Sequence, residues 1–371
     1  MEIQVEQGRL SRALASVSRV AAGARTTLPI LSNVLIKAED NRVSLTATNL
    51  DMAVVEYVPV VSATDGVITV PAKILAEFVS NLPRGEMITM KVEGVKVKIT
   101  AGAYTSTING VMADDFPELP EIDEKTAVKY KMGLDEFKVG VSEIIIAAGN
   151  DTTRPALMGV LFNTAEDNLY IAATDGYRLA EREFIKGVSS EVRAIVPATS
   201  LQEVLRSMTE DMDEIELVFD EAQVRFRMGE MEITSKLIDG TFPDYRVLFP
   251  KETEIEDLLI EKSELIRIAK MASVFSREVN QAIICEMDAD KQVFAISSIL
   301  NEVGENRSEI KTKVEKGGKV RVDARYLMTA LNALEEPMVR FGMPIKKGPI
   351  LIRNEKSDKY RHLVMRLKDD M

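Results

Sequence analysis

The sequence has no tryptophan, one cysteine and one histidine in 371 residues, and these shortages exclude several kinds of chemistry. With Cys285 alone, neither an intrachain disulfide nor a thiolate metal cluster can form. A single imidazole, His362, does not make a zinc site of the usual kind, which needs several Cys or His ligands. We therefore expect no metal and no cofactor, and we interpret Cys285 as a buried core residue.

The sequence also lacks long apolar runs and an excess of positive charge. No stretch approaches the roughly 20 apolar residues that a membrane-spanning helix needs. The opening residues, MEIQVEQGRL, do not have the basic-then-apolar order of a secretory signal, so we expect a cytoplasmic protein without a membrane partner. The net charge of −12 argues, for the chain as a whole, against binding to nucleic acid.

The motifs of common catalytic sites are missing as well. Gly317-Gly318-Lys319 lacks the preceding glycine and the following Ser or Thr of a phosphate-binding loop. A carboxylate and a cation do occur together at Asp175 and Arg178, which leaves open an α+β enzyme with a polar site there. However, Asp and Gly after a strand are turn formers, and we interpret Asp175-Gly176 as a turn. We assign no catalytic residue.

What the sequence does contain is a repeat. Thr174 lies 126 residues after Thr48, and the same offset relates Val196-Pro197-Ala198 to Val70-Pro71-Ala72 and Phe242-Pro243 to Phe116-Pro117. A fainter third copy has Val322-Asp323-Ala324, 252 residues after the first. Because several matches share one offset, we predict three repeated domains, each with its own core, at residues 1–121, 126–250 and 254–371.

Each repeat has the same predicted order of elements. Apolar residues at helical spacing open the repeats near residues 10–21, 137–148 and 265–272, and a second helix follows Pro71, Pro197 and Asp323. Short strands of β-branched residues, such as 33–37, 43–47 and 54–58, lie between the helices, and Glu39-Asp40-Asn41 reads as a hairpin turn. Hairpin-length gaps leave no room for parallel crossovers, so the predicted class is α+β with antiparallel sheets.

The basic residues are not spread evenly. Gln7 to Ala38 contains five basic residues and no acidic one, and the matching helix of the third repeat is also basic. In the second repeat the corresponding helix is acidic. The two basic helices either present ordinary solvated faces or face phosphates. The second alternative is open to an acidic protein because phosphate binding needs basic residues at one surface only.

Several stretches together resemble one known family, the bacterial sliding clamp, which is the β subunit of DNA polymerase III. They are TLPILSNV at residues 27–34, TRP at 153–155, GVLF at 159–162, TDGYRLA at 174–180, FPDYR at 242–246 and MRL at 365–367. The resemblance covers the whole chain. It implies the DNA clamp fold, with two helices per domain, and a head-to-tail homodimer that closes a ring around double-stranded DNA. It also implies a non-catalytic processivity subunit of the DNA polymerase III holoenzyme, with no preference for a base sequence.

The resemblance also implies the surfaces that would meet DNA and a second subunit. The residues matched to family DNA contacts are Arg25 and Lys73, and Arg9, Arg12 and Arg267 are further candidates. The ring is expected to close between a strand carrying Tyr104 and Ile108 and the end of a helix carrying Val274 and Phe275.

A peptide-binding cleft between the second and third domains is the remaining implied site. Its expected partners are the polymerase III alpha subunit, the clamp loader, other polymerases and repair proteins. Its expected residues are Leu157, Thr174, Gly176, Tyr177, Arg178, Leu179, Pro243, Val247, Tyr326, Pro349, Leu363, Val364, Met365, Arg366 and Leu367. Apolar side chains would bury the peptide, and a few polar groups would fix its register. The alternative for each apolar residue is plain core packing.

Three positions depart from the family pattern. Arg246 is followed by Val247, where relatives often have a second arginine, so the polar rim of the cleft is expected to differ. Asp151 stands where some relatives have an uncharged residue at the DNA, and we assign it no DNA contact. Lys368-Asp369-Asp370-Met371 extends past the Arg-Leu pair at which many members end.

Overall fold

The computed structural model describes residues 1–23, 28–40, 42–119, 121–276, 281–298 and 304–368. Its contacts divide the chain into two compact units. Unit 1 consists of Met1–Leu134 and Gln202–Leu237, and unit 2 consists of Asp135–Leu201 and Ile238–Met371. The predicted second repeat therefore contributes to both units.

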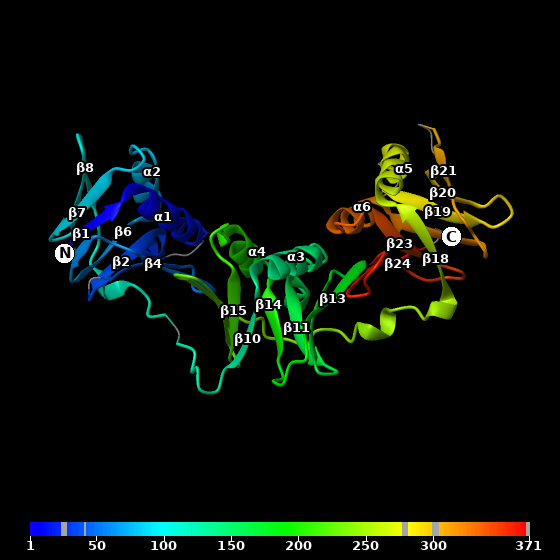
Figure 1. Ribbon diagram of the computed structural model, residues 1–371, viewed down its shortest axis with the longest axis horizontal. Coiled ribbons are helices and arrows are strands. Elements are labelled where there is room, and N and C mark those ends of the chain that lie inside the picture. Colours follow the sequence, from blue (N-terminus) through cyan, green and yellow to red (C-terminus); the bar gives the residue numbers. More distant parts are fainter. Residues whose placement is uncertain (24–27, 41, 120, 277–280, 299–303, 369–371) are drawn as a thin grey trace. The chain divides into compact units, whose positions relative to one another are not determined.

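Unit 1 contains two antiparallel sheets (Figure 1). The five-stranded sheet has the order β5-β1-β7-β8-β9, and the eight-stranded sheet has the order β10-β15-β16-β17-β4-β3-β2-β6. The strands of the smaller sheet are β1 (Glu2–Glu6), β5 (Ser62–Thr64), β7 (Met87–Glu93), β8 (Lys96–Ala101) and β9 (Tyr104–Asn109). Those of the larger sheet are β2 (Asn33–Glu39), β3 (Arg42–Thr48), β4 (Met52–Val58), β6 (Gly66–Pro71), β10 (Val128–Gly133), β15 (Glu214–Phe219), β16 (Gln223–Met228) and β17 (Met231–Lys236).

Unit 2 also has two antiparallel sheets, one of eight strands in the order β14-β11-β12-β13-β25-β24-β23-β18 and one of four in the order β21-β20-β19-β22. The strands of the larger sheet are β11 (Gly159–Ala165), β12 (Asn168–Thr174), β13 (Arg178–Lys186), β14 (Arg193–Pro197), β18 (Ile255–Glu261), β23 (Met338–Pro344), β24 (Ile350–Asn354) and β25 (Tyr360–Val364). Those of the smaller sheet are β19 (Ala282–Asp288), β20 (Val293–Ser298), β21 (Arg307–Lys311) and β22 (Gly318–Asp323).

Both large sheets cross the predicted boundaries between repeats. In unit 1, β17 of the second repeat pairs with β4 of the first, with Met231 opposite Glu56. In unit 2, β13 of the second repeat pairs with β25 of the third, with Arg178 opposite Val364. Pairing satisfies the backbone groups of strands that would otherwise be exposed edges. The repeats are thus joined by continuous hydrogen-bonded sheets.

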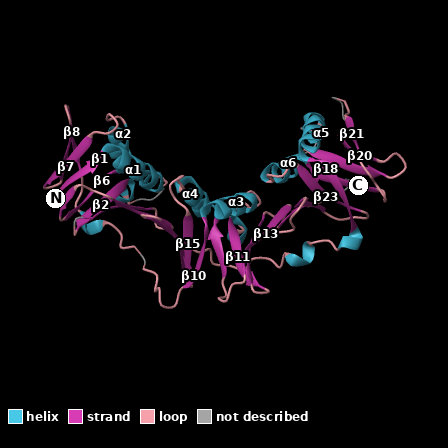
Figure 2. Cartoon of the chain, viewed as in Figure 1, coloured by secondary structure: helices cyan, strands magenta, loops and turns pink. Residues whose placement is uncertain are grey.

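The described residues contain six α-helices, two for each predicted repeat: α1 (Gln7–Ala22), α2 (Ala72–Ser80), α3 (Leu134–Ile145), α4 (Ala198–Ser207), α5 (Lys262–Phe275) and α6 (Ala324–Ala333). The predicted helix starts after Pro71, Pro197 and Asp323 are confirmed. Asp323 caps α6, because its carboxylate accepts the backbone N–H of Arg325 at 2.8 Å. Within their own units α1 packs beside α2, and α5 beside α6 (Figure 2).

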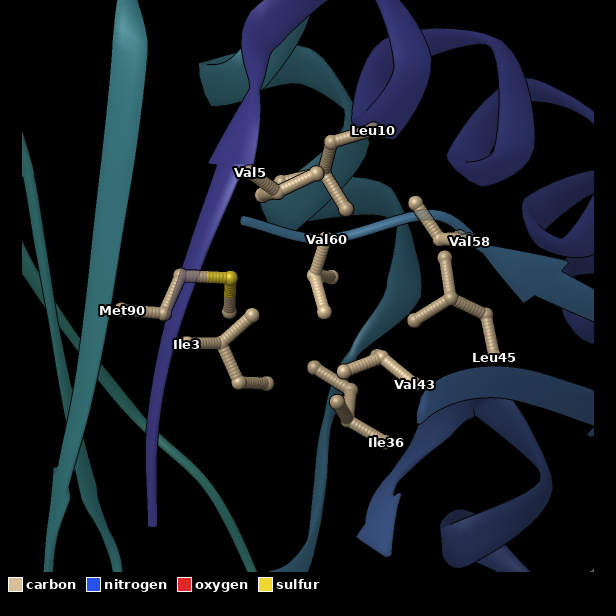
Figure 3. Close-up of a pocket in the computed structure, with 9 residues that line it drawn as sticks. All are labelled: Ile3, Val5, Leu10, Ile36, Val43, Leu45, Val58, Val60 and Met90. Atoms are coloured by element: carbon tan, nitrogen blue, oxygen red, sulfur yellow. The ribbon is translucent and has the colours of Figure 1, made fainter. Parts of the chain in front are cut away.

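One part of the core of unit 1 lies between its two sheets and α1. Side chains from both sheets and from the helix converge on a small apolar cavity (Figure 3), which is lined by Ile3, Val5, Leu10, Ile36, Val43, Leu45, Val58, Val60 and Met90. In unit 2, a core cluster joins Leu161 and Leu179 of the second repeat to Ile255 and Leu351 of the third. The second and third repeats therefore share part of their core across this boundary, because one continuous sheet joins them.

The structure also bears on Cys285, on the predicted hairpin turn and on membrane-spanning helices. Cys285 is fully buried on β19, and burial raises the pKa of its thiol to about 12, so the interpretation as a core residue is confirmed. The hairpin between β2 and β3 has Asp40 at a φ of 51°, and Asn41 lies outside the described residues. In the described part of the chain, no helix has the length and apolar content needed to cross a membrane.

Candidate functional site

The turn between β12 and β13 is held by its own side chains. Thr174 Oγ1 donates to the carbonyl of Arg178 at 2.6 Å and accepts the N–H of Gly176 at 3.0 Å. Asp175 Oδ1 accepts the N–H groups of Tyr177 and Arg178, and Oδ2 accepts Arg178 Nε at 3.0 Å. The interpretation of Asp175-Gly176 as a turn is confirmed. The carboxylate is occupied in shaping the backbone and in pairing with Arg178.

Two tyrosines meet beside this turn. The ring of Tyr177 stacks on that of Tyr326 from α6, with centroids 6.2 Å apart and planes at 16°. The guanidinium of Arg178 lies 4.8 Å from the Tyr326 ring centroid, a cation–π contact. Burial raises the pKa of Tyr326, and the nearby carboxylates of Asp175 and Asp323 act in the same direction. Tyr177 itself is 57% exposed, so the stacked pair has one face toward solvent.

The chain after β25 runs along the same turn. The N–H of Met365 donates to the carbonyl of Tyr177 at 2.9 Å, and the N–H of Leu367 donates to the carbonyl of Arg321 at 2.8 Å. These bonds hold the backbone of this segment beside Tyr177, and the Met365 side chain is half-buried. The structure therefore brings together three predicted segments, around residues 174–179, Tyr326 and 363–367.

A fourth predicted segment, residues 242–249, is anchored by two of its side chains in the core of unit 2. Phe242 and Tyr245 belong to the shared core cluster of unit 2, together with Leu179 and Leu363. The short helix η4 (Arg246–Leu248) follows, and in it Val247 is 75% exposed. We call Tyr177, Tyr326, Met365, Val247 and Leu248 the junction surface. These side chains all belong to unit 2 and are exposed or half-buried.

The predicted peptide-site residues separate into two groups by burial. Those with solvent exposure are Gly176, Tyr177, Arg178, Pro243, Val247, Tyr326, Pro349, Met365, Arg366 and Leu367. Those that are buried are Leu157, Thr174, Leu179, Leu363 and Val364. The buried apolar members pack as core, which is the alternative that the sequence left open for them. Their role at a peptide site stays a prediction and would be that of a floor.

The predicted DNA contacts are exposed, and their ion pairs are loose. The Nζ of Lys73 lies 3.9 Å from Glu77, and the side chain is 81% exposed. Arg12 and Arg267 approach Asp211 and Glu264 no closer than 3.9 and 3.8 Å. Arg9 lies 3.4 Å from Glu6 and is also exposed. Arg25 lies outside the described residues. Surface pairs of this kind are weak, so these cations remain available to phosphates.

The residues predicted to close a ring are only partly exposed. β9 is an edge strand of its sheet, and Tyr104 on β9 and Val274 in the last turn of α5 are exposed. Phe275 is half-buried. Ile108 is 7% exposed, because its side chain packs into the core of its own unit. Ile108 therefore offers little apolar surface, although its strand lies at the sheet edge, and its part in ring closure stays a prediction.

Three family models match the chain in order. The N-terminal domain of the DNA polymerase III beta subunit matches residues 1–120, the central domain matches 131–244 and the C-terminal domain matches 246–368. The chain belongs to the DNA polymerase III beta subunit family. The resemblance predicted from the sequence is confirmed, and so is the α+β class with repeated domains.

Known members of the family align over nearly the whole length of the chain. The beta sliding clamps of Staphylococcus epidermidis and Staphylococcus aureus are each 26% identical over 359 residues, which is 94% of this chain and 94% of theirs. The crystal structure of the DNA polymerase III subunit beta from Pseudomonas aeruginosa has a TM-score of 0.92 at 26% identity, covering 99% of this chain and 100% of that one. The sliding clamp of Bacillus subtilis has the same TM-score at 25% identity and covers both chains fully.

These comparisons give no support to the enzyme alternative at Asp175 and Arg178. The residues that sequence reasoning missed are instead two carboxylates, one buried on a helix and one half-buried on a strand. Glu143 on α3 is buried and bonded to Arg182, and burial raises its pKa to about 7 against the opposing charge of Arg182. Glu56 on β4 behaves similarly, with a pKa raised to about 7 by burial. A charged residue inside an otherwise apolar strand or helix face is the signal that would have found them.

Proposed function

We propose that the chain is a DNA sliding clamp that assembles as a head-to-tail homodimer, closes a ring around double-stranded DNA and acts as a processivity factor. The observation that carries the proposal is the ordered match of three beta-subunit domain models over the chain. We further propose that the domains are residues 1–121, 126–250 and 254–371 and that the protein works in the cytoplasm.

The proposed contact with DNA is electrostatic and independent of sequence. Arg9, Arg12 and Lys73 in unit 1 and Arg267 in unit 2 are exposed cations on helices. Such cations neutralise phosphates without reading bases, and loose phosphate contacts permit sliding. Ring closure is proposed between the edge strand β9 of one subunit and the end of α5 of the other, where Tyr104 and Val274 are exposed.

The proposed partners bind at the junction surface through short peptides. They are the polymerase III alpha subunit, the clamp loader, other polymerases and repair proteins. Exposed Tyr177 and half-buried Tyr326, together with half-buried Met365 and exposed Val247, supply apolar contact, while buried Leu179 and Leu363 form the floor. A methionine at such a site adapts to different peptides because its side chain is unbranched and flexible.

Retention on closed DNA tests the proposal. The clamp is loaded by its clamp loader onto nicked circular DNA and passed over a sizing column, before and after the circle is linearised. A ring is expected to stay on the circle and to slide off the linear form, and native mass should show a dimer. Equal loss from both forms, or a monomer at every concentration, would contradict the proposed ring.

A further inference from the structure

Glu181 is a buried carboxylate that binds three donors, two of them at the start of η4. It lies on β13 and is 1% exposed. The hydroxyl of Tyr245 donates to its Oε2 at 2.6 Å and Arg246 Nε donates to the same oxygen at 3.2 Å, while Arg361 Nη2 donates to Oε1. A buried carboxylate is stable only with such charge-assisted partners. Burial and the negative charge of Glu181 raise the pKa of Tyr245, so that its phenol stays a donor.

These bonds fix the direction of Arg246. Its guanidinium lies 4.4 Å from the ring centroid of Tyr170, and its Nη1 lies 3.8 Å from Glu166. Arg246 is therefore bound on one side by Glu181 and covered on another by an aromatic ring. It is the only arginine of η4, and Glu181 and Tyr170 hold it in this network.

The same network holds the segment that carries two exposed apolar side chains, Val247 and Leu248. Arg361 stacks over Phe249 at 4.1 Å, and Tyr245 is tied to Glu181 by its hydroxyl. Between these two anchors, η4 turns Val247 and Leu248 outward, and both are exposed. Because Arg246 is bonded to Glu181 and covered by Tyr170, the side chains that η4 contributes to the junction surface are both apolar. We call Val247 and Leu248 the apolar rim.

We propose that Glu181 determines the peptide preference of the junction surface: by holding Arg246 in the network, it leaves an apolar rim at Val247 and Leu248 that favours an apolar peptide side chain there and disfavours an acidic one. This inference rests on the proposed function. Glu181 is a positioning residue, because it acts through Arg246 and η4. The Arg246 side chain is 33% exposed, and Tyr170 and Glu166 contact it besides Glu181. We expect that without the charge of Glu181 its guanidinium is less firmly held and turns toward Val247.

Binding of matched peptides tests the inference. The probe is a short fluorescent peptide with a Gln, a Leu and a terminal Leu-Phe pair. It is compared with versions in which every position except the Gln is replaced by Glu, one position at a time. With the wild-type dimer, the Glu penalty should be largest at the position that contacts Val247. Glu181→Gln should reduce the penalty at that position by about fivefold, the size expected of one partly exposed charge pair. Glu183→Gln on the same strand, where the carboxylate pairs only with Lys186 among the described residues, should leave it unchanged.

Two further variants separate this mechanism from a general loosening of the fold. Arg246→Gln added to Glu181→Gln should restore the penalty, because the freed cation is then absent. Val247→Arg, at an exposed position that tolerates change, should reduce the penalty without touching the network. A penalty that is the same in wild type, Glu181→Gln and Val247→Arg would overturn the inference. Failure of every peptide to bind the wild type would instead refute the proposed peptide site.

Discussion

Leu50 and Gly176 occupy the same position in two copies of one turn. Thr48 bonds the carbonyl of Met52 and the N–H of Leu50, just as Thr174 bonds Arg178 and Gly176. Both central residues have positive φ, 76° for Leu50 and 90° for Gly176. Glycine adopts this conformation without a steric penalty, whereas the Cβ of leucine is strained there.

Replacing Leu50 with glycine should therefore stabilise the protein. The variant Leu50→Gly is expected to raise the free energy of unfolding by roughly 0.5–1 kcal/mol, because relief of backbone strain exceeds the small loss of partly exposed apolar contact. Urea denaturation followed by circular dichroism measures the change. The reciprocal variant Gly176→Ala should lower stability by a similar amount. A destabilised Leu50→Gly would show that the leucine side chain contributes more than the strain costs.

Glu143 and Glu56 should give the stability a distinctive dependence on pH. Burial raises the pKa of each to about 7 from a usual value of 4.5. The folded state then binds more protons than the unfolded state between these two values, so its stability is complete below about pH 4.5 and falls as the pH rises toward 7. For one such group the full loss is roughly 3–4 kcal/mol at most.

Neutral substitutions should remove this loss. Glu143→Gln keeps a hydrogen-bond acceptor for Arg182 but has no charge to desolvate. Glu56→Gln also removes a charge that burial disfavours. Each variant is expected to show a smaller drop in unfolding free energy between pH 4.5 and 7, and the double variant a smaller drop still. The exposed Glu136 lies on the same helix as Glu143, so Glu136→Gln is the control and should retain the wild-type profile. Identical profiles for all variants would mean that both carboxylates stay ionised when folded.

Elements defined by local sequence were the predictable part of this fold. The helices after Pro71, Pro197 and Asp323 and the hairpin between β2 and β3 follow from short-range spacing and turn chemistry. The pairings of β17 with β4 and of β13 with β25 join residues far apart in the chain, and nothing local specifies them. The candidate site shows the same limit. The turn at Asp175 was predictable, whereas the buried roles of Glu181 and Glu143 depend on what packs over them.

A variant at Met365, in the segment that follows β25, tests whether the junction surface binds a peptide. Its backbone N–H bonds Tyr177 regardless of the side chain, so Met365→Ala should keep the segment in place. The variant is expected to weaken binding of the Gln-Leu-Leu-Phe type of peptide by roughly 1–3 kcal/mol if Met365 is an interface anchor. Titration calorimetry measures the affinity, and Met271→Ala, an exposed methionine on α5, is the control. Unchanged affinity, or a loss accompanied by unfolding, would place the peptide elsewhere.

The dimer should depend on the apolar end of α5. Val274 is exposed, so Val274→Asp leaves the subunit core intact while placing a charge in the proposed interface. Folded monomers are expected in native mass measurements, because the apolar contact is lost and the carboxylate is desolvated. Ile108→Asp is unsuitable for this purpose, since Ile108 is buried in its own unit. A dimer that persists in Val274→Asp would exclude this end of α5 from the interface.

For the assembled ring, DNA affinity should be weak and steeply dependent on salt, because an acidic protein can hold DNA only through a local set of cations. Each cation that neutralises one phosphate contributes about 0.9 to the slope of log affinity against log salt concentration. The double variant Arg25→Gln with Lys73→Gln is therefore expected to flatten that slope by about 2 units. Fluorescence anisotropy at several salt concentrations measures it, and Lys98→Gln on β8 is the exposed-lysine control.

Since loose phosphate contacts carry no sequence information, duplexes of different sequence should give the same slope. An unchanged slope in the double variant would remove Arg25 and Lys73 from the DNA path, and a preference for one sequence would be incompatible with sliding.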